Sequence, residues 1–236
     1  MKNNYKNIAI AIILVVLGTA IGYMYSEKRN KLPTPSTDCQ KNVPTNKSVN
    51  NNIDISNITP FSSDIVIYNS HAGENYPSGL KVTDVGVLIN NKLVKEGLKS
   101  RFIKCNPPTE YAKAYKITHD LITKNVKNYS DTILLDIHRD TTENPKSDTK
   151  KIQLILAKGN PHYKENKKFA DLLLAELRKS TEVKSDIFEF NGEVLSYFNQ
   201  DLSNNSMLIE IGNDMSSDSD IEECINVLVS ALKNNI

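Results

Sequence analysis

The segment 132–140, TILLDIHRD, decides the fold class, because its apolar run ILL (133–135) is closely followed by the three polar residues HRD (138–140). Short apolar runs that are rich in β-branched side chains and bounded by polar clusters are typical of strands. Four more segments have this form: 64–68 (DIVIY), 101–105 (RFIKC), 151–157 (KIQLILA) and 206–211 (SMLIEI). The sequence therefore predicts five strands.

Amphipathic segments lie between these strands and predict helices. Their apolar stripes are Val85, Leu88, Ile89 and Leu93, ending near Gly97; Tyr111, Tyr115 and Leu121; Phe169, Leu172, Leu173 and Leu177; and Ile221, Cys224, Ile225, Leu228 and Leu232. Alternating strands and helices predict an α/β fold: a mostly parallel twisted sheet with helices on both faces.

Composition and charge exclude several classes of protein. The 29 Lys and Arg residues nearly balance 28 Asp and Glu residues, which argues against a nucleic-acid binder. No P-loop and no G-x-S-x-G elbow occurs in the sequence, so nucleotide-hydrolysing and serine-hydrolase classes have no support. Cys39, Cys105 and Cys224 are too far apart for a CxxC metal site; a disulfide stays open but is not suggested.

The N-terminal part differs in composition from the rest of the chain. After a short tail, residues 1–7, the uncharged run 8–25 is long enough to span a bilayer core as a helix. A cleaved signal peptide is the alternative, because small residues in this run could offer a cleavage site. Residues 26–61 are rich in Asn, Ser, Thr, Lys and Pro and predict a flexible linker. Residues 62–236 are then expected to form a single exported domain, and the site residues described below would make it the catalytic domain.

Polar residues follow three of the predicted strands at their carboxyl ends. His71 and Glu74 come after the first strand, His138 comes directly after 132–137, and Glu210 lies near the end of the last strand. An open α/β sheet carries its site just outside the carboxyl ends of its strands. We therefore expect these four side chains at one rim of the sheet.

The residue types at this rim suit a catalytic zinc site. Such a site typically has three protein ligands and an open position for water, and His71, Glu74 and His138 are a suitable set. Glu210 could be the general base, which takes a proton from zinc-bound water and later gives it to the leaving nitrogen. From spacing alone, two exposed histidines and two glutamates in unrelated ion pairs remain an alternative.

Several further residues have open roles. Asp136 could orient His138 or accept backbone hydrogen bonds. Arg139 could hold a substrate carboxylate or polarise the scissile carbonyl, and it could equally pair with Asp140 or Asp201. Substrate contact by His162 is open, although a turn residue is the simpler interpretation.

The order of motifs resembles the stage II sporulation protein P family. The matching segments are IYNSHAGENY (67–76), VGVLINNKLVKEG (85–97), EYAKAY (110–115), DIHRD (136–140), KGNPHYKENKKFA (158–170) and NQDLSNNSMLIEIG (199–212). The family consists of membrane-anchored cell-wall hydrolases related in fold to zinc-dependent N-acetylmuramoyl-L-alanine amidases. The resemblance implies hydrolysis of the amide between N-acetylmuramic acid and L-alanine in peptidoglycan, with an endopeptidase activity on cross-links also attributed to the family.

The resemblance also implies a setting and partners. Expected partners are a lytic transglycosylase and a membrane scaffold protein that act with the enzyme at the sporulation septum, during septal thinning and engulfment. By position, the family's acting residues fall on His71, Glu74, His138 and Glu210, and Asn69 replaces a family histidine. Substrate-binding positions are expected at Arg139 and at the segment Asn199, Gln200 and Asp201.

A non-catalytic module that binds peptidoglycan or localises to the septum on the same fold is the alternative function. The intact set of His71, Glu74, His138 and Glu210 favours the enzyme, since a pure binder needs neither an open metal site nor a base.

Overall fold

The computed structural model describes residues 52–53, 61–107, 111–142, 144, 146–192 and 196–235. The expected anchor, residues 8–25, lies outside the described residues, as does most of the expected linker. Within the described part of the chain, no helix combines the length and the apolar character needed to cross a membrane.

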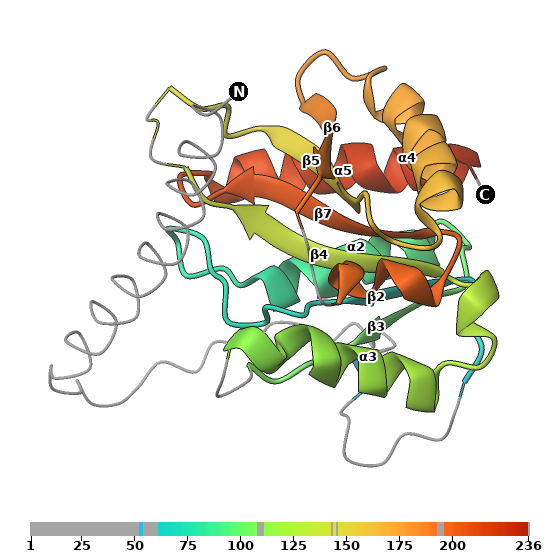
Figure 1. Ribbon diagram of the computed structural model, residues 1–236. Coiled ribbons are helices and arrows are strands. Elements are labelled where there is room, and N and C mark those ends of the chain that lie inside the picture. The colour runs from blue at the N-terminus through green and yellow to red at the C-terminus, as the bar shows by residue number, and fades with distance from the viewer. Residues whose placement is uncertain are drawn as a thin grey trace, which may run out of the picture. The chain divides into compact units, whose positions relative to one another are not determined.

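Seven strands form one sheet in the order β1-β3-β2-β4-β7-β5-β6. Figure 1 labels β2 to β7. Their bounds are β1 Asn52–Ile53, β2 Ile65–Tyr68, β3 Ser100–Ile103, β4 Ile133–Asp140, β5 Lys151–Ala157, β6 Lys184–Phe190 and β7 Ser206–Asn213. All neighbours are parallel except β5 and β7, which are antiparallel. The expectation of a mostly parallel sheet is therefore wrong: the sheet is mixed, with β5 and β6 opposed to the other five strands.

The connection from β4 to β5 explains this reversal. A parallel return requires a crossover of about a dozen residues or more, usually a helix. Residues 141–150 contain no helix where the structure describes them, so β5 returns in the opposite direction. β6 then follows β5 through helix α4, Tyr163–Leu177, and is parallel to it.

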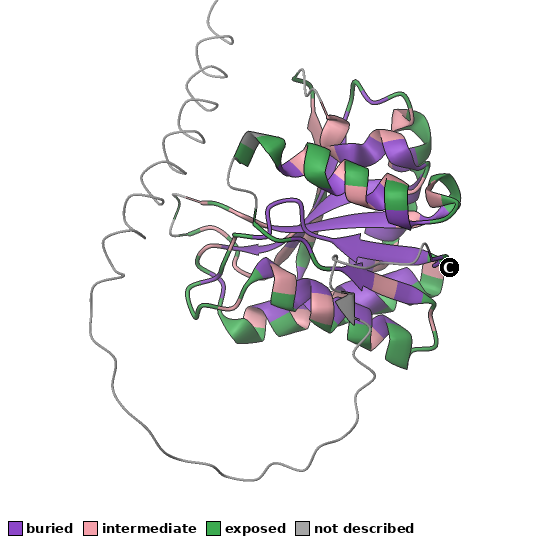
Figure 2. Ribbon diagram, turned by 90° about the horizontal axis from the view of Figure 1, so that it is seen from below, coloured by how far each residue is buried: buried purple, intermediate pink, exposed green. Residues whose placement is uncertain are grey.

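Helices cover both faces of the sheet, as expected. Helices α2 (Val82–Lys95), α4 and α5 (Asp218–Asn235) pack against one face in the larger apolar cluster. Helix α3 (Ala114–Asn125) packs against the other face through Ile122, beside Val66, Tyr68 and Leu134. Figure 2 shows the buried strands between these helical layers. The predicted second helix starts later than its first apolar residue, because Tyr111–Lys113 form the separate 3-10 turn η2.

Two strands were not predicted. β6 has the sequence KSDIFEF, whose alternating polar residues are exposed or half-buried because the strand lies at one edge of the sheet. Edge strands commonly carry charges, which weakens the apolar signal. β1 lies at the opposite edge and falls inside the range expected to be linker.

Candidate metal centre

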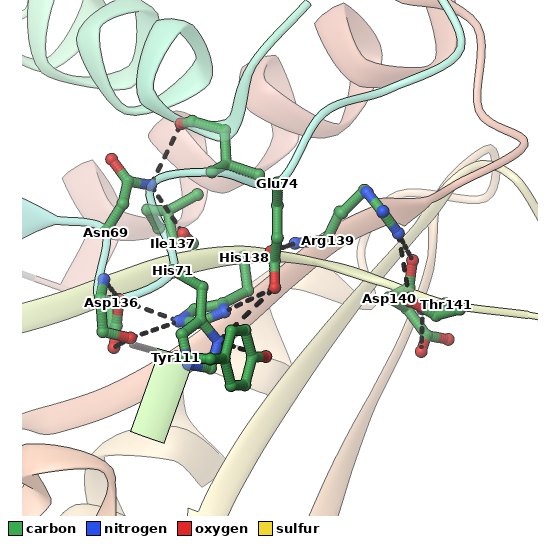
Figure 3. Close-up of polar contacts among 12 residues, drawn as sticks. Asn69, His71, Glu74, Tyr111, Asp136, Ile137, His138, Arg139, Asp140 and Thr141 are labelled. Carbon is green, nitrogen blue, oxygen red and sulfur yellow. Dashed lines mark hydrogen bonds and ion pairs between the residues drawn. The ribbon is translucent and has the colours of Figure 1, made fainter. Parts of the chain in front are cut away.

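The structure brings His71, Glu74 and His138 together. His71 and Glu74 lie in the turn after β2, and His138 lies in β4, the neighbour of β2 in the sheet. One ligand atom from each of the three side chains lies within 4.8 Å of the other two. The Oε1 atom of Glu74 is 3.6 Å from Nδ1 of His71 and 3.5 Å from Nδ1 of His138 (Figure 3).

Asn69 holds the turn that carries two of these residues. Its buried side-chain amide donates to the backbone carbonyls of Ile137, at 2.6 Å, and Val82, at 3.1 Å. The turn is closed by the N–H of Glu74, which donates to the carbonyl of His71 at 3.1 Å. Asn69 therefore connects the end of β2 to β4 and to the start of α2.

Asp136 and Ser70 determine which nitrogen of His138 faces the cluster. The Nε2 atom of His138 lies 3.0 Å from Oδ1 of Asp136 and 2.9 Å from Oγ of Ser70. Asp136 is fully buried and also accepts hydrogen bonds from the N–H and hydroxyl of Ser70, at 2.8 and 2.6 Å. Asp136 thus takes both roles that the sequence left open. The Nδ1 atom of His138 therefore faces Glu74. A histidine with one nitrogen on a carboxylate and the other free for a ligand is typical of metal sites.

The charges in the cluster are coupled. Burial by itself would raise the pKa of Glu74, but His138 and His71 outweigh it and hold that pKa well below its usual range. Burial by itself would lower the pKa of His138, but Asp136 and Glu74 outweigh it and raise that pKa well above its usual range. The backbone N–H of Arg139 donates to Oε2 of Glu74 at 3.1 Å and fixes the carboxylate.

The residues of this cluster fit a zinc ion. Two imidazoles and one carboxylate are a donor set of open catalytic zinc sites. The Nε2 atom of His71 is buried and has no hydrogen-bond partner among the described residues, which is uncommon for a buried polar atom. Each of the three side chains offers one ligand atom within 4.8 Å of the other two, so together they can hold one ion.

Tyr111 completes the solvent side of the cluster, and the sequence did not indicate it. Its phenol oxygen lies 2.8 Å from Nδ1 of His71, and its ring stacks on the His71 ring with centroids 3.8 Å apart. Tyr111 is 59% exposed. The sequence places Tyr111 on a helical stripe and in the matching segment 110–115; neither connects it to a histidine 40 positions away.

Glu210 lies beside the cluster on β7. It is the register partner of His138, and partners on adjacent strands project to the same face of a sheet. Burial and the nearby Asp140 raise the pKa of Glu210 to about 7, against the opposing effect of His138 and Lys151. A carboxyl group with this pKa changes protonation state near neutral pH, as a general base must.

Arg139 is engaged by neither of the carboxylates considered from the sequence. Its guanidinium donates to the carbonyls of Asn75, at 2.7 Å, and Asp140, at 3.1 Å, and to the hydroxyl of Thr141, at 3.1 Å. The carboxylate of Asp140 pairs instead with Lys151. Arg139 thus braces the loop beside Glu74.

Asn199 and Gln200 are buried, and their amides are used within the protein. The Asn199 amide donates to the Tyr115 carbonyl and the Thr118 hydroxyl, at 3.1 and 2.8 Å. The Gln200 side chain bonds the backbone of β5 at Ile155 and Ala157, at 2.8 and 2.9 Å. Asp201 is half-buried, and its Oδ1 atom has no partner among the described residues. The structure therefore gives Asn199 and Gln200 a positioning role.

The remaining candidates lie elsewhere. His162 precedes α4 and does not cap it with its side chain. His119 lies on α3, with Nδ1 3.5 Å from a carboxylate oxygen of Asp120. Cys105 and Cys224 are buried free thiols, and burial raises the pKa of each to about 12, which makes a reactive thiolate unfavourable.

Fold and site together define an α/β protein with a two-histidine, one-glutamate metal-type site at the carboxyl ends of neighbouring strands. The family profile described as stage II sporulation protein P (SpoIIP) matches residues 20–233. The chain therefore belongs to the stage II sporulation protein P family, as the motifs indicated.

Solved structures with a similar fold are distant in sequence. Murine aminoacylase 3 is 13% identical with a TM-score of 0.50, covering 76% of this chain and 66% of its own. The amidase Ami1 from Mycobacterium smegmatis is 11% identical with a TM-score of 0.47, covering 75% and 98%. The CwlD amidase from Clostridioides difficile, solved with the GerS lipoprotein, is 16% identical with a TM-score of 0.47, covering 73% and 98%. At these identities the likeness concerns the fold alone. The comparison with curated proteins produced no match.

Proposed function

We propose that this protein is a metal-dependent peptidoglycan hydrolase of sporulating cells. One observation carries the proposal: His71, Glu74 and His138 converge within 4.8 Å, with Glu210 in register beside His138. Membership of the stage II sporulation protein P family supports the cell-wall substrate and the sporulation setting.

The side chains divide the chemistry between them. His71, Glu74 and His138 would hold one zinc ion, which supplies Lewis acidity and lowers the pKa of a water when bound. Glu210 accepts the proton that the attacking water loses and returns it to the leaving nitrogen. Asp136 and Ser70 keep His138 in the required orientation throughout.

The amide between N-acetylmuramic acid and L-alanine is the bond we propose, on the strength of the family motifs. We further propose that residues 8–25 anchor the protein in the membrane, that the domain is extracytoplasmic at the septum, and that a lytic transglycosylase and a membrane scaffold protein are its partners. The run of uncharged residues at 8–25 supports the anchor.

The test is mass spectrometry of the products from purified peptidoglycan after incubation with the zinc-loaded full-length chain. Amidase action is expected to release peptides that begin with a free L-alanine and to leave peptide-free muramic acid. The His138→Ala variant serves as the matched control and is expected to release neither. Products cut only within the peptide would contradict the proposed bond, and undiminished release by the variant would contradict the site.

A further inference from the structure

A row of aromatic side chains leads away from the metal centre. The ring of Tyr115 meets the ring of His71 edge-on, with centroids 5.0 Å apart. Phe198 follows at 5.5 Å from Tyr115, and Phe190 follows at 5.6 Å from Phe198. Phe188 is two residues before Phe190 on β6 and so projects to the same face of the sheet. We call Tyr115, Phe198, Phe190 and Phe188 the aromatic row.

All members of the aromatic row are partly accessible to solvent. Tyr115, Phe198 and Phe190 are half-buried, and Phe188 is 50% exposed at the edge of the sheet. The three helices α2, α4 and α5 pack in the apolar cluster of the opposite face, which excludes all four members of the row. An apolar row that is continuous with a catalytic site is expected to be used in binding.

The chain holds Phe198 in this row at a conformational cost. Tyr197, Phe198 and Asn199 all have positive φ angles, 46°, 55° and 59°. The left-handed region is unfavourable for residues other than glycine, and such strain persists only where the surroundings hold it. Strained residues cluster at functional sites, so this segment is a candidate for one.

Buried hydrogen bonds on both sides hold the strained segment. The Asn199 amide fastens it to α3, at the carbonyl of Tyr115 and the hydroxyl of Thr118. The Gln200 side chain fastens it to β5, and the Gln200 carbonyl accepts from the side chains of Asn160 and Asn166, at 3.1 and 2.9 Å. These contacts place the ring of Phe198 between Tyr115 and Phe190.

The charge pattern indicates a neutral ligand. Glu74 and Glu210 lie at the metal end of the row, so this end already carries two carboxyl groups. Among the described residues, the one ring covered by a cation is that of Phe61, under Arg101, outside the row. A peptide rich in carboxylates gains little here, whereas the apolar face of a sugar ring can stack on aromatic rings.

We propose that the aromatic row binds the glycan strand of the substrate, so that the sugar rings stack along it and the scissile amide reaches the metal centre. This inference rests on the proposed function, since it assigns part of the same substrate. It also explains why Asn199 and Gln200 are buried: they position the row and do not touch the ligand.

The test measures glycan binding separately from hydrolysis. The probe is chitotetraose, the neutral tetramer of N-acetylglucosamine, titrated into the full-length chain and followed by NMR or calorimetry. Phe188→Ser removes the exposed ring at the edge. Phe198→Asn removes the central ring and installs a residue that tolerates the left-handed backbone. Leu172→Ser is the matched control, because Leu172 is 53% exposed on α4, outside the row.

We expect each phenylalanine variant to weaken chitotetraose binding about 3- to 10-fold, as the loss of one stacking contact implies. Zinc content should equal that of the wild type, and the peptidoglycan KM should rise with little change in kcat. Leu172→Ser should bind as the wild type does. Three outcomes would overturn the proposal. The first is that the wild type does not bind chitotetraose, and the second is that the phenylalanine variants bind it with wild-type affinity. The third is that the variants lose affinity for a free stem tripeptide and not for chitotetraose. If the wild type binds chitotetraose through the row but releases no peptide, the hydrolase proposal fails and the glycan site stands.

Discussion

Asp136 acts on the proposed metal centre through a single side chain, His138. Asp136→Asn weakens the hydrogen bond to Nε2 that orients the imidazole and raises its basicity. We expect zinc affinity to fall about 10- to 100-fold, the usual effect of losing such a partner. Competition with a chromophoric chelator measures this. Asp171→Asn, at an exposed position on α4, is the control and should bind zinc as the wild type does. Unchanged affinity in Asp136→Asn would show that His138 does not need this partner.

Glu210 is expected to act as a general base, whereas His71, Glu74 and His138 are expected to bind the metal. Glu210→Gln keeps the shape of the side chain and removes its ability to accept a proton. Peptide release from peptidoglycan should fall by roughly two to four orders of magnitude, as for a lost general base. Zinc content, measured on the same preparation, should stay near one ion per chain, because the proposed ligands His71, Glu74 and His138 are unchanged. Loss of zinc would make Glu210 a ligand, and full activity would remove it from the mechanism.

Glu210 also makes stability depend on pH. Its pKa rises from 4.5 to about 7 on folding, so the folded protein binds the proton more tightly than the unfolded chain does. Stability from this group is fully present below pH 4.5 and is lost as pH rises through 7. Denaturant unfolding of the metal-free protein at pH 5 and pH 8 tests this. Glu210→Gln should gain up to about 3 kcal/mol relative to the wild type at pH 8, and much less at pH 5. An equal gain at both values would contradict the assignment.

At the residue scale, the sequence singles out a side chain where it departs from its local pattern. Glu210 stood out because a carboxylate interrupts an apolar strand, and His138 stood out because it directly follows one. Tyr111 and Ser70 carry no such signal: a tyrosine on a helical stripe and a serine in a turn are ordinary residues. Their roles arise from contacts with His71 and His138 that only the folded chain makes.

At the scale of elements, α2 approaches the sheet closely at Gly86. A Cβ atom there would lie 2.5 Å from Cε2 of Phe102 and 3.2 Å from Oδ1 of Asn69. Gly86→Ala should therefore destabilise the protein by about 1–3 kcal/mol through overpacking. This outweighs the gain of about 1 kcal/mol in helix propensity. Thermal unfolding measures the difference. Asn91→Ala, at an exposed position of the same helix, should be neutral or stabilising. A stabilised Gly86→Ala would show that α2 can shift.

The elements themselves were largely predictable. All five expected strands form, and β5 has the predicted bounds. The four expected helices form, and most of the stripe residues of α2, α4 and α5 are buried. Three stripe residues, Leu88, Tyr111 and Leu172, are exposed instead. β6 escaped prediction because it lies at the edge of the sheet, where no residue of the strand is fully buried and its apolar pattern is weak.

At the scale of the whole molecule, metal binding is expected to stabilise the fold, since its ligands come from the separate elements β4 and the turn after β2. Zinc at about 100 times its dissociation constant should add about 2.7 kcal/mol to the free energy of unfolding. Calorimetry should show a higher Tm with zinc, reversed by a chelator. His138→Ala should show no such rise. A wild-type Tm unaffected by zinc would contradict a folded-state site.

Local sequence determined the class of elements and the residues that could bind metal, because periodicity records which side of each segment is buried and the end of an apolar run marks a rim of the sheet. The tertiary structure decided the rest: the strand order, the reversal of β5 and β6, the nitrogen of His138 that faces Glu74, and the aromatic row. The physical reason is range. These features depend on contacts between residues tens of positions apart, such as Asn199 with Thr118, and no local pattern in the chain encodes such pairs.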